Sequence, residues 1–151
     1  MLGGLSPLSL ILRLIRRRLR ISVNGLEGVI IPVNAGLSSK PSGIYIEDVS
    51  FEDTFGTYHG PGECGMTIPA ITLAGLIARY SISREAVLKI DCEGCEYDVM
   101  PNNYRNVKLF DKIAFEYHGG AIDRLLKVLV KDYNCSHVVE HGVVYCTRKH
   151  V

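Results

Sequence analysis

The chain has 151 residues and a formal net charge of +1, and 47% of its residues are hydrophobic while 22% are charged. This length fits one domain with a single core, which we expect over 1–151, and the composition excludes wholesale disorder. The near-zero net charge excludes a general electrostatic attraction to nucleic acid, so we expect no nucleic-acid partner.

The first segment is rich in arginine. Residues 8–20 place five arginines among Leu and Ile at helical spacing, which predicts a basic amphipathic helix over 1–22. Arg13 interrupts the apolar run well before the roughly 20 residues that a membrane span needs. The charges follow the apolar residues instead of preceding them, unlike a secretory signal. A helix packed on the core and a helix on a membrane surface both fit this pattern, and a phosphate-binding face fits it too.

The next part of the chain predicts short strands and a loop. An apolar run over 29–33, interrupted by Pro32, predicts a strand that ends near the proline. A second short strand is expected over 44–49. Residues 50–70 are rich in Gly, Thr and Pro and show little periodicity, so we expect a long loop there, with room for an irregular hairpin.

The second half alternates helices and strands. The expected helices cover 72–80, with Thr72 as N-cap, then 94–100, stopped by Pro101, and 121–133. The expected strands cover 86–90, 112–117 and the two arms of a closing hairpin around His141-Gly142. Such alternation predicts an α/β sheet, mostly parallel and covered on both faces, with a C-terminal antiparallel hairpin.

Two predicted strands end in polar residues. The first ends in Asp91-Cys92-Glu93-Gly94-Cys95-Glu96, and the second in Glu116-Tyr117-His118-Gly119-Gly120. Ligands of open α/β sheets bind beyond the carboxyl ends of the strands, so neighbouring strands would bring these groups to one crevice. Carboxylates and an imidazole gathered there can act as general bases. Structural alternatives stay open. Asp91 can cap the following helix, and the helix dipole can stabilise the negative charge of Glu96 near the N-terminus.

The chain has five cysteines, an odd number, and its sequence shows no export signal. That pattern predicts reduced thiols and a cytoplasmic protein. Cys92 and Cys95 form a C-x-x-C pair that, with Cys135 and Cys146 or His137, offers a weaker alternative of a tetrahedral zinc site. We rank structural or incidental thiols first and expect no metal.

The segments "LKIDCEGCEYDVM" and "FDKIAFEYHGG" resemble the FkbM family of S-adenosylmethionine-dependent methyltransferases, and the likeness extends over most of the chain. The resemblance implies a partial Rossmann-like, class I methyltransferase sheet and O-methylation of a small-molecule or glycan acceptor. By position, it places four residues at the methyl-transfer and acceptor site: Asp91, Glu93, Glu116 and His118. It places Glu96 as a brace at the helix start. It assigns four residues to binding of S-adenosylmethionine: Asn34, Ala35, Asp91 and Gly94.

The family's glycine-rich first strand, the main cofactor motif, is not found in this sequence. The chain therefore resembles the C-terminal portion of such an enzyme, and enzymatic activity is left open. One alternative is an inactive or partner-dependent remnant that acts as an interaction module. In that case a second copy or another chain would cover an exposed sheet edge. A zinc-stabilised domain is the third and weakest alternative.

Overall fold

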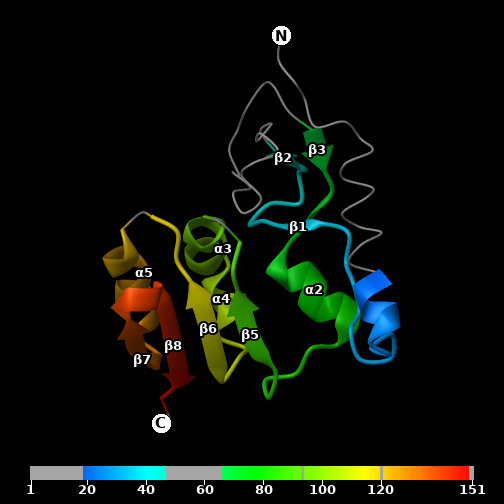
Figure 1. Cartoon of the computed structure of the whole chain (residues 1–151). Coiled ribbons are helices and arrows are strands. Elements are labelled where there is room, and N and C mark those ends of the chain that lie inside the picture. Colours follow the sequence, from blue (N-terminus) through cyan, green and yellow to red (C-terminus); the bar gives the residue numbers. More distant parts are fainter. Residues whose placement is uncertain (1–18, 47–65, 93, 120, 150–151) are drawn as a thin grey trace.

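A computed structural model describes residues 19–46, 66–92, 94–119 and 121–149 (Figure 1). The second half of the chain forms a four-stranded sheet with strand order β5-β6-β8-β7. The strands are β5 (Val87–Ile90), β6 (Lys112–Glu116), β7 (Tyr133–Val138) and β8 (Val143–Arg148). β5 and β6 are parallel, whereas β8 runs antiparallel to both β6 and β7. The fold is therefore mixed α/β, and the predicted C-terminal antiparallel hairpin is confirmed.

Four helices accompany this sheet: α2 (Leu73–Tyr80), α3 (Glu96–Asn102), α4 (Tyr104–Val107) and α5 (Ile122–Leu129). A single 3₁₀ turn, η1 (Val139–His141), separates β7 from β8. Figure 1 shows β7, β8, β6 and β5 in succession, with α2 beyond β5. The predicted helix over 121–133 is shorter than expected, because the chain enters β7 at Tyr133.

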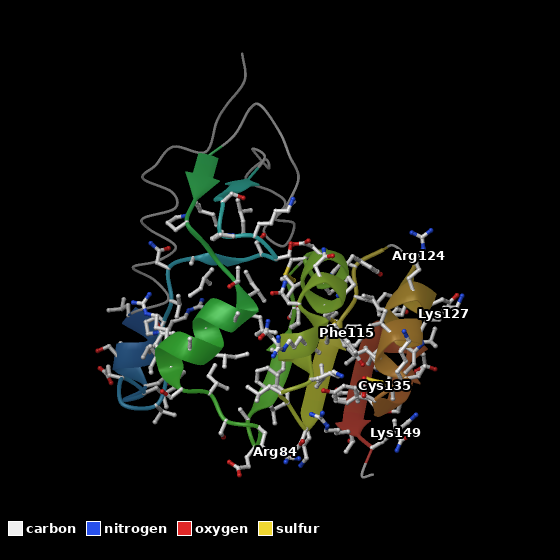
Figure 2. The ribbon with its side chains drawn as sticks, turned by 180° about the vertical axis from the view of Figure 1, so that it is seen from behind. Arg84, Phe115, Arg124, Lys127, Cys135 and Lys149 are labelled. Atoms are coloured by element: carbon white, nitrogen blue, oxygen red, sulfur yellow. A yellow bond between two sulfur atoms is a disulfide. The ribbon has the colours of Figure 1, made fainter. Side chains whose placement is uncertain are left out.

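The core lies between one face of the sheet and the helices. Inward residues such as Ile90, Phe115 and Val144 pack with Leu125 of α5 and are almost fully buried. Burial of this apolar surface is the main favourable contribution to folding. Figure 2 shows Phe115 within the molecule, whereas Arg124 and Lys127 project outward from α5.

The opposite face of the sheet is only partly covered. Along β5 buried and exposed residues alternate, and Val87 is 59% exposed. The prediction that the strands would be covered on both faces is therefore wrong for β5. The apolar run that suggested it contains Lys89, which the alternation of a strand places on the outer face with Val87.

Local sequence signals explain the helix boundaries near the sheet. Thr72 caps α2 as predicted, because its hydroxyl oxygen accepts a hydrogen bond from the backbone N–H of Gly75 at 3.0 Å. α3 extends past Pro101, whereas the sequence predicted that the proline would stop it. Pro101 lies in the last turn, so little helix follows the lost hydrogen bond, and α4 begins at Tyr104.

Two small sheets lie in the N-terminal half. β1 (Gly36–Leu37) pairs in parallel with β4 (Ala70–Ile71), and β2 (Ile44–Ile46) pairs antiparallel with β3 (Met66–Ile68). The predicted strand over 44–49 is thus present as far as Ile46, while 47–49 lie outside the described residues. The predicted loop over 50–70 is wrong for 66–70, which belong largely to β3 and β4, and its residues 50–65 lie outside the described part.

The predicted strand over 29–33 is wrong. Those residues form turns and irregular structure, and Val29 and Ile31 are 77% and 66% exposed. Pro32 lacks the backbone N–H that a sheet ladder needs, and the strand of this region is β1, a few residues later. Of the predicted N-terminal helix, 1–18 lie outside the described residues and 19–23 are helical. No helix in the described ranges is long and apolar enough to cross a membrane.

Four of the cysteines form disulfides, Cys92–Cys95 and Cys135–Cys146. The prediction of reduced thiols is wrong for these four residues. Cys135 and Cys146 are register partners on β7 and β8, with Cα atoms 4.1 Å apart, so the antiparallel pairing brings them together. These disulfides leave none of the four as a thiolate for zinc. They also weigh against a cytoplasmic location, which stays a prediction, because disulfides persist mainly in oxidising compartments.

Candidate functional site

The site forms where the two parallel strands end. In the register of β5 and β6, Ile90 is opposite Phe115, so the next residue in line after Ile90, Asp91, comes level with Glu116. His118 follows two residues after Glu116, in the loop that leads to α5. The parallel pairing therefore gathers Asp91, Glu116 and His118 at the carboxyl ends of the strands, as the sequence predicted.

The three side chains face one another. His118 Nε2 lies 3.9 Å from Asp91 Oδ1 and 3.8 Å from Glu116 Oε1. One ligand atom from each residue falls within 4.8 Å of those of the other two. The side chains of Asp91 and Glu116 are 40% and 44% exposed and that of His118 is 25% exposed, so the cluster is open to solvent. We call Asp91, Glu116 and His118 the strand-end cluster.

A buried carboxylate lies behind the strand-end cluster. Glu96, the first residue of α3, is fully buried and accepts the backbone N–H of Gly94 at 2.9 Å and that of His118 at 2.8 Å. Its Oε1 also lies 3.6 Å from His118 Nδ1. Burial of a carboxylate is costly unless hydrogen bonds satisfy it. Glu96 is satisfied by backbone groups from both strand-end loops, so it joins those two loops.

Gly94 and Gly119 take conformations that favour glycine, with φ of +109° and +63°. Apart from its chain neighbours, the described residues have no atom within 4 Å of the position where a Cβ would stand at Gly94. Tyr97 of α3 donates its hydroxyl proton to the carbonyl of Gly119, which holds the second loop against α3. Burial raises the pKa of Tyr97, and the nearby Glu96 carboxylate raises it further, so the hydroxyl stays protonated and keeps donating.

A lysine that the sequence analysis missed also belongs to the site. Lys89 Nζ lies 3.0 Å from Asp91 Oδ2, and Asp91 Oδ1 is the oxygen that faces His118. The signal was present in the sequence, since residues two apart in a strand share a face. Both side chains are well exposed, so this ion pair contributes little to stability; Asp91 has one oxygen near Lys89 and the other near His118.

The remaining predicted site residues have different outcomes. Glu93 lies outside the described residues. Glu96 occupies the predicted position at the helix start, but its contacts extend to the backbone of the second loop. Asn34 is exposed and Ala35 half-buried; both precede β1, which pairs with β4 and not with the four-stranded sheet. Their binding to a cofactor stays a prediction.

Comparison with family models, with curated proteins and with solved structures finds no match to this chain.

Proposed function

We propose that this chain carries the acceptor side of an S-adenosylmethionine-dependent methyltransferase of the FkbM type, acting on an oxygen of a small-molecule or glycan acceptor. One observation carries the proposal: parallel β5 and β6 bring Asp91, Glu116 and His118 together at their carboxyl ends. The C-terminal antiparallel hairpin supports it, because the motif resemblance implies a mostly parallel sheet with such a hairpin. The Rossmann-like fold is part of the proposal.

The strand-end cluster has the chemistry to prepare a hydroxyl group. In the proposal, the acceptor O–H donates to His118 Nε2, and the imidazole takes the proton as the oxygen gains its methyl group. Asp91 and Glu116 lie 3.9 and 3.8 Å from Nε2, so their negative charges favour the imidazolium that forms. Either carboxylate can take the proton directly if the acceptor hydroxyl approaches from its side. S-adenosylmethionine supplies the methyl group when bound.

The described residues fit part of a cofactor site. The space that the described residues leave at Gly94 lets a large ligand approach the backbone, and Asp91 offers a carboxylate at the same strand end. These two residues would hold the cofactor in the proposal, with Asn34 and Ala35 contributing from the segment before β1. Ser39, in the same segment, donates from its backbone N–H and its hydroxyl to Asp98 of α3 at 2.9 and 2.7 Å. That contact attaches the segment to the helix that follows Gly94.

Calorimetric titration of the whole chain with S-adenosylhomocysteine tests cofactor binding. We expect a saturable heat that weakens in Asp91→Asn and persists in Asp123→Asn, a matched change on the exposed face of α5. Transfer of labelled methyl groups from S-adenosylmethionine to a panel of glycans and hydroxylated metabolites then tests the reaction. The absence of heat from a cooperatively folded chain would contradict cofactor binding by this chain.

The second candidate is a non-catalytic or partner-dependent module, and the position of β5 favours it. Among the described strands, β5 pairs only with β6, so its outer edge has no described partner strand. An unpaired edge is a template for another strand, and a second copy of the chain could supply it. Sedimentation velocity at rising protein concentration tests this candidate: a dimer is expected, and a monomer at every concentration would contradict it.

A further inference from the structure

We propose that the strand-end cluster is a binding site for a divalent cation of the Mn²⁺ type. His118 Nε2 and one oxygen each from Asp91 and Glu116 would be its protein ligands. The proposal stands on the geometry of these three residues and does not depend on methyl transfer. It assigns a different use to His118, because the lone pair of Nε2 can hold either a proton or a metal ion.

The distances suit one shared ion. Ligands at about 2.1 Å from a common ion lie roughly 3 to 4 Å from one another, depending on the angle between them. The 3.9 Å from Nε2 to Asp91 Oδ1 and the 3.8 Å to Glu116 Oε1 fall in this range. All three candidate ligand atoms lie within 4.8 Å of one another. In the proposal, ion binding brings the carboxylate oxygens of Asp91 and Glu116 into the same range of about 3 to 4 Å from each other.

The surroundings of His118 are those of a metal ligand. A metal-binding imidazole usually directs its second nitrogen to a carboxylate, which sets the orientation of the ring. Here Nε2 faces Asp91 and Glu116, whereas Nδ1 faces the buried Glu96 at 3.6 Å. Glu96 is itself fixed by the backbone N–H groups of Gly94 and His118. The ring thus has a buried carboxylate near Nδ1, and its other nitrogen faces two more exposed oxygens.

The charge of the strand-end cluster and its exposure to solvent also suit a bound cation. Three carboxylates, those of Asp91, Glu116 and Glu96, lie around His118, against one ammonium, that of Lys89, so negative groups outnumber positive ones at the cluster. Lys89 pairs with Asp91 Oδ2 and leaves Oδ1 directed at the cluster. The exposure of the cluster leaves coordination positions open to water or to an oxygen of a substrate, as in catalytic metal sites.

The ligand types select among cations. Mg²⁺ and Ca²⁺ favour sites made only of oxygen, whereas an imidazole nitrogen favours transition metals and zinc. One nitrogen with two carboxylate oxygens therefore suits Mn²⁺ and its neighbours better than Mg²⁺. Mn²⁺ is also the most useful probe, because free and bound Mn²⁺ differ in their electron paramagnetic resonance spectra.

The test is a Mn²⁺ titration of the whole chain, followed by electron paramagnetic resonance, without any adenosyl compound. We expect one bound ion per chain and a pulsed spectrum that shows coupling to an imidazole nitrogen. Glu116→Gln, which changes a half-exposed side chain, should weaken binding by at least about 10-fold. His118→Ala should weaken binding similarly and abolish the nitrogen coupling.

Exposed residues of η1 provide matched controls. His141→Ala and Glu140→Gln change the same residue types outside the three-residue cluster, in the turn that leads to Gly142 beside Tyr117, and should leave the affinity unchanged. Circular dichroism establishes that each variant is folded. The proposal is overturned if the folded wild-type chain binds no Mn²⁺, or if His141→Ala removes the nitrogen coupling and His118→Ala keeps it. Because no cofactor is present, a negative titration with S-adenosylhomocysteine leaves this result unaffected.

Discussion

Glu96 Oε1 accepts the backbone N–H of His118 at 2.8 Å and lies 3.6 Å from Nδ1 of the same residue. A single buried carboxylate therefore holds the backbone after β6 through the N–H of His118 and lies beside Nδ1 of the imidazole. Its other oxygen accepts the N–H of Gly94, in the loop after β5. The pairing of β5 with β6 sets the positions of the strand ends, and Glu96 joins the two loops that follow them.

Glu96→Ala should reduce the free energy of unfolding by about 3 kcal/mol, since it leaves two backbone N–H groups without their acceptor in a buried place. Urea unfolding followed by circular dichroism measures the loss. Glu140→Ala, an exposed change in η1, is the control and should stay within about 0.5 kcal/mol. Equal losses in the two variants would show that Glu96 does not join the loops.

The sequence predicted elements best where one local signal determined them. Thr72 precedes an apolar stripe and caps α2, and Leu125 and Leu129 recur at the spacing that defines the buried face of α5. The run over 29–33 misled because β-branched residues favour a strand only when a partner strand is present. Pro32 in that run removes one of the groups that a partner would need.

Long-range partners were harder to predict. Glu96 could be assigned to its own helix from sequence, but its contact with the N–H of His118 depends on the parallel pairing of β5 with β6. The disulfide of Cys135 with Cys146 could have been found, because a hairpin that turns near His141 places these two residues opposite each other. The prediction of reduced thiols used the number of cysteines, which carries no information about strand register.

The Cys135–Cys146 disulfide should stabilise the fold more than Cys92–Cys95. Their sequence separations are 11 and 3, and a longer closed loop restricts the unfolded chain more. We expect Cys135→Ala/Cys146→Ala to lower the free energy of unfolding by about 3 kcal/mol and Cys92→Ala/Cys95→Ala by about 2 kcal/mol. Urea unfolding under oxidising conditions measures both. A larger loss of unfolding free energy in Cys92→Ala/Cys95→Ala than in Cys135→Ala/Cys146→Ala would contradict this account. So would an unfolding free energy of wild type that does not fall when both disulfides are reduced.

The contact between Ser39 and Asp98 should make stability depend on acid pH. Burial of Asp98 opposes its ionisation, but hydrogen bonds from Ser39 and Asn102 outweigh burial and hold the pKa of Asp98 below its ordinary value. Such a group stabilises the fold fully above the unfolded-state pKa of about 3.9, and the contribution is lost as pH falls through the lower folded-state pKa.

Wild type and Asp98→Asn should therefore differ in unfolding free energy at pH 7, and the difference should shrink as pH falls below the unfolded-state pKa of about 3.9 and through the lower folded-state pKa. Urea unfolding at several pH values measures the difference. Ser39→Ala removes one of the hydrogen bonds, 2.7 Å long, and keeps the backbone donor, so a smaller difference with the same pH dependence is expected. A difference that stays constant from pH 7 to pH 3 would show that ionised Asp98 does not anchor the segment.

Two neighbouring residues at the end of α5 test where the core lies. Leu129 is 1% exposed and packs in the core, whereas Val130 is 46% exposed. Leu129→Ala removes buried methyl groups and leaves a cavity, so the free energy of unfolding should fall by about 3 kcal/mol. Val130→Ala shortens a half-exposed side chain and should cost less than about 1 kcal/mol. Urea unfolding of both variants measures the contrast, and similar losses would mean that α5 packs on the sheet through a different face.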